Sequence, residues 1–324
     1  MNPAFSVIFF TTLIGAGQGL FSALYIGEVY AFFNIADKNN PSQMIETGLF
    51  LVVILMTLGL FASMFHLGRP ERAWRAMSQW RTSWLSREII ILMVFVVMVI
   101  LWGLTYLGKD SLLLGNFKVH TDLIIGLIAT ILAIFLYICT AMIYVVIRFI
   151  QEWSTPLTVF NYVLLGLSSG FIQVTALASY FQSPLIDFYT ICTLSLILAA
   201  MIVRLLSLYR NKHIKYKSTI KTALGTQDEK VRRISQKNEI SPYDTRKFFH
   251  YSSLGLMRLI KGLFLIFAFV MPFFLVILGW SEDDSGILIA AIFIQYIGLL
   301  AERWYFFAQA NHPKNIKYKG VSVN

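Results

Sequence analysis

Eight long apolar segments dominate the sequence and leave it few ways to fold. They cover residues 5–33, 44–67, 87–107, 121–149, 156–181, 185–208, 257–280 and 285–308. About 20 apolar residues in helical conformation cross the hydrocarbon core of a bilayer. Turn signals such as "NNPS", "STP" and "EDDSG" separate the segments. We therefore predict an all-α integral membrane protein with eight transmembrane helices.

The composition excludes a soluble domain. Hydrophobic residues make up 57% of the chain and charged residues only 14%, whereas soluble domains carry about 25% charged residues. No internal repeat divides the chain, so we expect residues 1–324 to form one integral membrane domain with a loop at about 209–256. The first apolar segment lacks the basic start of a signal peptide, and we expect it to be a retained span.

The distribution of positive charge predicts the orientation. With eight spans, both termini and the loops after spans 2, 4 and 6 lie on one side. Of the 27 Lys and Arg residues, only Lys38, Lys109 and Lys118 lie on the other side, while the carboxylates divide almost evenly. The positive-inside rule then places both termini in the cytoplasm. We expect a multi-pass protein of the bacterial cytoplasmic (inner) membrane.

The net charge of +10 does not indicate a nucleic-acid partner. The cations flank the membrane, where orientation and contact with anionic lipids account for them. The loop at about 209–256 is longer than orientation requires, so docking of a soluble partner is as good an interpretation as lipid contact.

Metal and haem sites find little support in the sequence. Cys139 and Cys192 lie in apolar segments, and two thiols alone cannot form a zinc or iron–sulfur site. None of the five histidines lies deep within a predicted span, as a haem b ligand should. We predict neither metal, haem nor catalytic residue in this chain, so any redox cofactor is either small and not bound by cysteine, or belongs to a partner chain.

His66 and Glu88 are the candidate ligand-binding residues. His66 ends the second predicted span and Glu88 opens the third, on the same side of the membrane. Imidazole titrates near neutral pH, and a nearby carboxylate can orient it and pass protons onward. A membrane-soluble quinone, whose two-electron reduction consumes two protons, suits such a pair. The alternative makes His66 a helix-end residue and Glu88 a favourable charge at a helix N-terminus.

The loop between these two residues is rich in arginine and tryptophan. Arginine at a membrane edge pairs with lipid phosphate, and tryptophan anchors interfaces. Planar guanidinium also suits ion pairs at a protein interface, so part of the loop is a candidate contact with another subunit. The residues are Arg69, Arg72, Arg75, Arg81 and Arg87, interleaved with Trp74, Trp80 and Trp84.

Several polar residues lie within the predicted spans. Gln18 in "GAGQG" fits close helix packing as well as ligand contact. Tyr162, Glu302 and Arg303 lie near the cytoplasmic ends of their spans, and charges there usually face the bundle interior. Glu302 and Arg303 are adjacent, hence about 100° apart on a helix, and need not pair with each other.

Several motifs resemble a known family. "HLG" at 66–68, "RAW" at 72–74 and "SWLSREI" at 83–89 are similar to the membrane-anchor subunits of the dimethyl sulfoxide reductase type. The opening "NPAFSVIFFTTLIGAGQGL" and the ending "ERWYFFAQANHPKNIKY" resemble one branch, the anchors of cytoplasmic quinone-linked sulfite dehydrogenases. The likeness extends over essentially the whole chain, including its eight spans.

The resemblance implies a haem-free subunit that binds menaquinone or ubiquinone at His66 and Glu88. It also implies two partners on the cytoplasmic face: a ferredoxin-like iron–sulfur subunit, and a catalytic subunit that holds molybdopterin and the substrate. Gly68, Arg72 and Trp74 would contact the iron–sulfur subunit, and we add Arg75 to this interface.

We therefore expect a subunit that passes electrons between a partner iron–sulfur cluster and quinone during sulfite oxidation. The same anchor role in a quinol-oxidising dimethyl sulfoxide reductase is the alternative. A secondary transporter and a purely structural anchor stay open as other classes.

Overall fold

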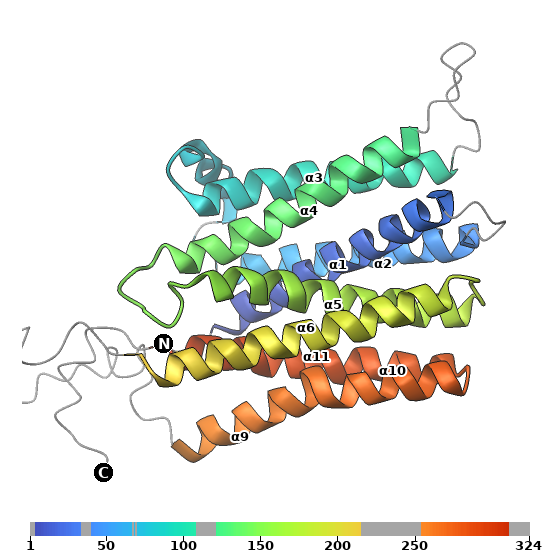
Figure 1. Ribbon diagram of the computed structural model, residues 1–324. Coiled ribbons are helices and arrows are strands. Elements are labelled where there is room, and N and C mark those ends of the chain that lie inside the picture. The colour runs from blue at the N-terminus through green and yellow to red at the C-terminus, as the bar shows by residue number, and fades with distance from the viewer. Residues whose placement is uncertain are drawn as a thin grey trace, which may run out of the picture.

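The protein is all helical over the residues that its computed structural model describes, which are 4–33, 40–66, 68, 70–107, 121–214 and 254–310. Eight helical segments are long and apolar enough to cross a membrane, as the sequence predicts. The elements run roughly side by side (Figure 1). They are α1 (Phe5–Phe33), α2 (Ser42–Met64), the 3-10 helix η1 (Pro70–Gln79), α3 (Trp84–Leu107), α4 (Thr121–Val145), α5 (Pro156–Tyr180), α6 (Ile186–Lys212), α9 (Leu254–Leu265), the π-helical segment η2 (Ile266–Val270), α10 (Met271–Ser281) and α11 (Ser285–Ala308). The seventh span consists of α9, η2 and α10 in continuous succession.

Some predicted boundaries were wrong by a few residues. α2 ends at Met64 and α4 at Val145, both earlier than expected. α6 continues to Lys212, into the predicted loop at 209–256, because Arg210 and Lys212 in its last turn interact favourably with the helix dipole. The rest of this loop, residues 215–253, lies outside the described residues.

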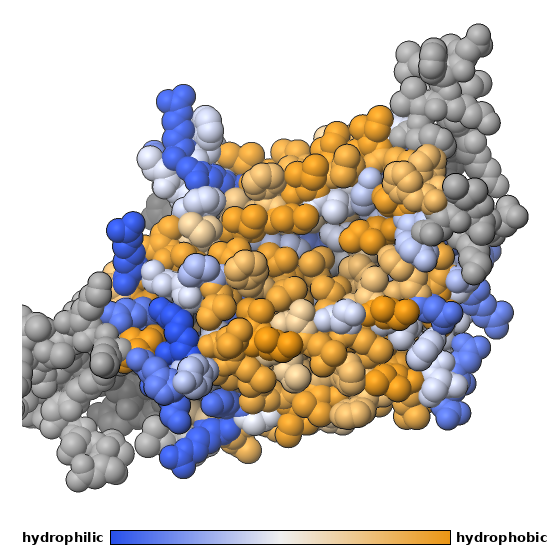
Figure 2. Space-filling view, viewed as in Figure 1, coloured by the Kyte–Doolittle hydropathy of each residue, from blue (hydrophilic) through white to orange (hydrophobic). Residues whose placement is uncertain are grey.

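The surface is divided as a membrane protein requires. On the face shown in Figure 2, apolar side chains form a belt across the middle of the bundle, and hydrophilic residues gather at its two ends. Large apolar side chains in this belt are highly exposed, as with Phe50 at 66% and Phe293 at 66%. Such a patch is far larger than a soluble monomer exposes, and lipid covers it.

One end of the bundle, here called the N-terminal face, carries the features that matter most below. α1 begins there, α2, α4, α6 and α11 end there, and η1 projects from it, on the left of Figure 1. The cytoplasmic location of this face stays a prediction.

α1 is the central helix. It packs against α2, α4, α5 and α11. Of the 18 residues in its most apolar stretch, 78% are buried. Glycines allow the closest approach: a Cβ atom at Gly170 of α5 would lie 1.9 Å from the backbone carbon of Gly19. Gly19 of "GAGQG" therefore serves close helix packing, one of the two interpretations of this motif.

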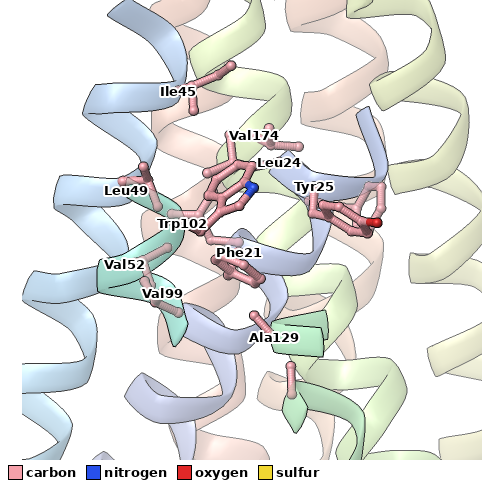
Figure 3. Packing of buried hydrophobic residues seen from close by; sticks show 14 of the residues in the cluster. Phe21, Leu24, Tyr25, Ile45, Leu49, Val52, Val99, Trp102, Ala129 and Val174 are labelled. Atoms are coloured by element: carbon pink, nitrogen blue, oxygen red, sulfur yellow. The ribbon is translucent and has the colours of Figure 1, made fainter. Parts of the chain in front are cut away.

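A cluster of buried apolar side chains, with aromatic rings among them, packs α1, α2, α3, α4 and α5 together (Figure 3). The ring of Phe21 lies 5.2 Å from that of Trp102 and 5.5 Å from that of Phe95, both in edge-to-face geometry. Edge-to-face pairs stabilise packing beyond their buried area. This core fixes the position of α3, the helix that carries Glu88.

The seventh span changes its helical type at residues 266–270. Pro272 has no N–H group, and its ring would clash with the carbonyl of Ala268 in a regular α-helix. The π-helical segment precedes and accommodates this proline. Gly298 of α11 packs against it, since a Cβ atom there would lie 2.2 Å from Ala268 N. The apolar pattern of residues 257–280 does not predict this irregularity.

Candidate functional site

Glu88 is a buried carboxyl group near the start of α3. Its side chain is 3% exposed, and Thr140 of α4 donates a hydrogen bond to its Oε1 atom at 2.5 Å. The same Thr140 hydroxyl lies 3.0 Å from the backbone carbonyl oxygen of Leu136. Glu88 lies beyond the first turn of α3, so a simple interaction with the helix dipole does not explain it. A buried carboxyl with a hydroxyl partner can hold and exchange a proton.

His66 lies at the N-terminal face, just after the last turn of α2. Its backbone N–H donates to the carbonyl of Ser63 at 3.2 Å, and its side chain is exposed. The ring centroid of Phe10 lies 6.2 Å from the imidazole centroid, in edge-to-face geometry. Partial burial lowers the pKa of His66 below its usual value, which favours the neutral imidazole near pH 7.

His66 and Glu88 do not touch each other directly: no hydrogen bond or ion pair joins them in the part of the chain that the structure describes. Both instead contact the wall of one cavity. Phe10, which packs against His66, and Thr140, which binds Glu88, line it together. His66 and Glu88 therefore each contact a residue that lines the same cavity.

The cavity lies between α1, α4, α5 and α11, in the half of the bundle nearest the N-terminal face. The space open to the centre of a water molecule is about 20 Å³, which is enough for one or two waters. Hydroxyl, amide and guanidinium groups share its wall with apolar side chains. The lining residues are Phe10, Thr11, Thr12, Ile14, Gly15, Gln18, Tyr137, Thr140, Tyr162, Leu165, Gly166, Ser169, Leu299 and Arg303.

A buried ion cluster lies behind Arg303. Glu302 Oε1 lies 2.9 Å from Arg204 Nη2, and Glu302 Oε2 lies 3.4 Å from Arg303 Nε. All three side chains belong to residues that are at most 4% exposed. Adjacent Glu302 and Arg303, whose angular separation on the helix left their pairing open, lie within ion-pair distance of each other. Two guanidinium groups and one carboxylate leave the cluster with one net positive charge.

The predicted interface residues lie on the surface of the N-terminal face. Residues 70–79 form the 3-10 helix η1 rather than an irregular loop. Gly68, Arg72, Trp74 and Arg75 are all exposed, with Trp74 at 63%. The guanidinium of Arg75 lies 5.5 Å from the Trp74 ring centroid. Their role stays a prediction, and exposed aromatic and arginine side chains suit it.

Sequence reasoning missed Thr140, Phe10 and Arg204. Arg204 carried a signal, because an arginine within a predicted apolar span requires an internal partner. Thr140 and Phe10 carried none, since threonine and phenylalanine are common in membrane helices.

The eight apolar spans define the chain as an integral membrane protein. Its polar cavity lies nearest one face of the bundle, and exposed arginine and tryptophan side chains lie on that same face. The model of the family "DMSO reductase anchor subunit (DmsC)" matches residues 1–307, so the chain belongs to this family of membrane anchors. It is therefore the anchor subunit of a multi-subunit oxidoreductase complex.

Individual relatives agree with this family. The chain is 42% identical to the C subunit of sulfite dehydrogenase from Allochromatium vinosum over 326 aligned residues, which cover 99% of this chain and 100% of the relative. It is 27% identical to the C subunit of anaerobic dimethyl sulfoxide reductase from Haemophilus influenzae, over 51% of this chain and 54% of the relative. It is 30% identical to the anaerobic dimethyl sulfoxide reductase chain YnfH of Escherichia coli, over 53% and 56% respectively.

Proposed function

We propose that this chain is the quinone-reactive anchor of a molybdopterin and iron–sulfur oxidoreductase. It passes electrons from a partner iron–sulfur subunit to quinone in the membrane, during oxidation of sulfite by the catalytic partner. The observation that carries this proposal is the buried Glu88–Thr140 pair beside a polar cavity, together with the contact of His66 with Phe10 of the cavity wall.

The arrangement suits a reaction in which electrons and protons arrive at one molecule. Reduction of a quinone to a quinol takes two electrons and two protons. Glu88 and His66 can each supply a proton or accept a hydrogen bond, and His66 is exposed enough to exchange protons with water. The apolar belt lets a lipid-soluble ligand reach the bundle laterally.

The N-terminal face is the docking surface for the partners in this proposal. Gly68, Arg72, Trp74 and Arg75 lie there on or beside η1, exposed and close in sequence to His66. An iron–sulfur subunit seated on them would bring its nearest cluster to the same end of the bundle as the cavity. Short distance is what electron transfer requires, so the placement supports the assignment.

Sulfite oxidation is preferred because the similarity to a sulfite dehydrogenase subunit extends along the full length of both chains. The similarity to dimethyl sulfoxide reductase subunits covers about half of this chain. Those relatives support a second candidate, in which the same site oxidises quinol to drive a reductase.

The test uses the purified complex to which this chain belongs. His66→Gln and Glu88→Gln should each lower sulfite-dependent quinone reduction by about 10²–10⁴-fold, the usual contribution of a proton-transferring side chain. Activity with a water-soluble electron acceptor should stay at the wild-type level, because the catalytic partner is untouched. His213→Gln and Glu46→Gln, which change exposed residues of the same types, serve as matched controls.

Wild-type quinone kinetics in both site variants would remove His66 and Glu88 from the mechanism. A wild-type complex that contains no molybdopterin partner, or that reacts with no quinone, would refute the proposed function itself.

A further inference from the structure

Three buried polar atoms at the cavity lack hydrogen-bond partners within the described part of the chain. They are Gln18 Oε1, Tyr162 Oη and Arg303 Nη1. Their side chains are 1%, 4% and 4% exposed, and all three residues line the cavity. A buried polar group without a partner is destabilising and rare in folded proteins. Three such groups around one cavity leave hydrogen-bonding capacity for a ligand or for ordered water.

Arg303 is held in place by its other contacts. Glu302 binds its Nε side at 3.4 Å and is itself fixed by Arg204. The guanidinium carbon lies 3.7 Å from the ring centroid of Tyr162, a short cation–π contact. The Nη1 group therefore remains as a donor of fixed orientation, within a cluster that carries one net positive charge.

We propose that this cavity is the inner end of the quinone site, where Arg303 and Tyr162 donate hydrogen bonds to one oxygen of the quinone head group. This inference rests on the proposed function and extends it to two donors distinct from His66 and Glu88. Positive charge beside that oxygen stabilises the negative charge that the head group gains as electrons arrive.

Gln18 completes the set of hydrogen-bonding groups. A quinone oxygen only accepts hydrogen bonds, whereas a quinol hydroxyl also donates one. Arg303 and Tyr162 supply donors for the oxidised form, and the Oε1 atom of Gln18 supplies an acceptor for the reduced form. The cavity can therefore satisfy both redox forms of the ligand.

The size of the cavity determines how the ligand fits. Space for one or two waters admits one oxygen atom, and the ring must lie beyond it. Phe10 lies between the cavity and His66, since it lines the cavity and also contacts the His66 ring. The head group would take the position of the half-buried Phe10 ring, with its second oxygen directed toward His66.

The experiment compares variants that remove the donors with one that fills the space. Tyr162→Phe deletes only the hydroxyl, and Arg303→Lys keeps the charge but loses the planar fork. Gly15→Ala adds a methyl group at the cavity wall, where the nearest other atom would be 3.8 Å away, so it fills space without a clash. Tyr180→Phe, exposed at the far end of the same helix, and Gly262→Ala, with nothing within 4 Å, are the matched controls.

The measurement is the KM of the purified complex for a short-chain ubiquinone or menaquinone analogue, alongside activity with a water-soluble acceptor. Tyr162→Phe and Gly15→Ala should each raise this KM by about tenfold, as expected for one lost hydrogen bond or an equivalent loss of space. Activity with the soluble acceptor and the controls should stay at the wild-type level. Should Arg303→Lys fail to assemble, Tyr162→Phe and Gly15→Ala decide alone.

Wild-type KM values in Tyr162→Phe and Gly15→Ala would overturn the inference, because the cavity would then hold only water. A raised KM in Gly15→Ala without one in Tyr162→Phe would also overturn it, since the donors would have no part in binding. These outcomes require a wild-type complex that reduces quinone, so they are distinct from failure of the proposed function.

Discussion

Glu302→Gln should destabilise the protein more than Arg204→Met, which changes one of the two arginines that Glu302 binds. Its carboxylate lies between two guanidinium groups, 2.9 Å from Arg204 and 3.4 Å from Arg303. Glu302→Gln removes the only negative charge of the cluster and leaves two buried cations side by side. Arg204→Met, in contrast, leaves a neutral pair and fills most of the space.

The expected magnitude follows from these distances. Unit charges about 4 Å apart attract by about 4 kcal/mol at an effective dielectric constant of about 20, and Glu302→Gln removes two such attractions while retaining the desolvation of both arginines. Breaking a buried pair in this way typically destabilises a protein by about 3–5 kcal/mol. Arg204→Met loses one attraction but also removes a buried cation and its repulsion with Arg303. Its cost should therefore be smaller than that of Glu302→Gln by about 2 kcal/mol or more.

The assay is the unfolding equilibrium of the purified protein in detergent or lipid nanodiscs, with both variants measured in parallel. Glu282→Gln, at an exposed carboxylate, should stay within about 0.5 kcal/mol of the wild type. Equal destabilisation by Arg204→Met and Glu302→Gln would refute the reasoning, because it would mean that packing rather than charge balance holds the cluster together.

Two further predictions concern the packing of α1 and the titration of His66. Gly170→Ala should strongly reduce folding yield and thermal stability, because its Cβ atom would lie 1.9 Å from the backbone of Gly19 and neither backbone can move freely. Gly262→Ala, with nothing within 4 Å, should leave folding yield and thermal stability unchanged. The pKa of His66 is lowered by partial burial, so the stability that it contributes is full above its unfolded pKa of about 6.5 and is lost as pH falls through the lower folded value. The midpoint of thermal unfolding should therefore fall more between pH 7 and pH 5 for the wild type than for His66→Gln, and parallel curves would contradict this.

The number of spans and their approximate limits could be predicted because long apolar segments have few alternatives in a membrane protein. The ends of α2 and α6 could not, since a helix continues or stops according to its caps and last-turn charges rather than its hydropathy. Pro272 within an apolar segment was a possible signal for the π-helical segment. Gly298, which leaves room for that segment, lies on another helix, so its role can be seen only once the packing of the helices is known.

The candidate site was only half predictable. His66 and Glu88 stand out because charged or titratable residues are rare at the ends of apolar spans. Thr140 and Phe10 do not, because their importance comes from which helix faces which. The pairing of Glu302 with Arg303 could only be left open, because side-chain length, and not only the angle around the helix, determines what an arginine can reach.

Protonation of Glu88 would change the hydrogen bonds that the Thr140 hydroxyl makes. The Thr140 hydroxyl has one hydrogen but two acceptors within reach, the Glu88 carboxyl group and the Leu136 carbonyl oxygen. While Glu88 is ionised, that hydrogen is directed to the carboxylate. Once Glu88 is protonated, its own hydrogen can be donated to Thr140, and the hydroxyl can turn to the α4 backbone. Protonation of Glu88 thus reverses the hydrogen bond between Glu88 and Thr140 and leaves the Thr140 hydrogen for the Leu136 carbonyl oxygen. The charge state of a residue on α3 therefore alters a hydrogen bond of α4 without moving a helix.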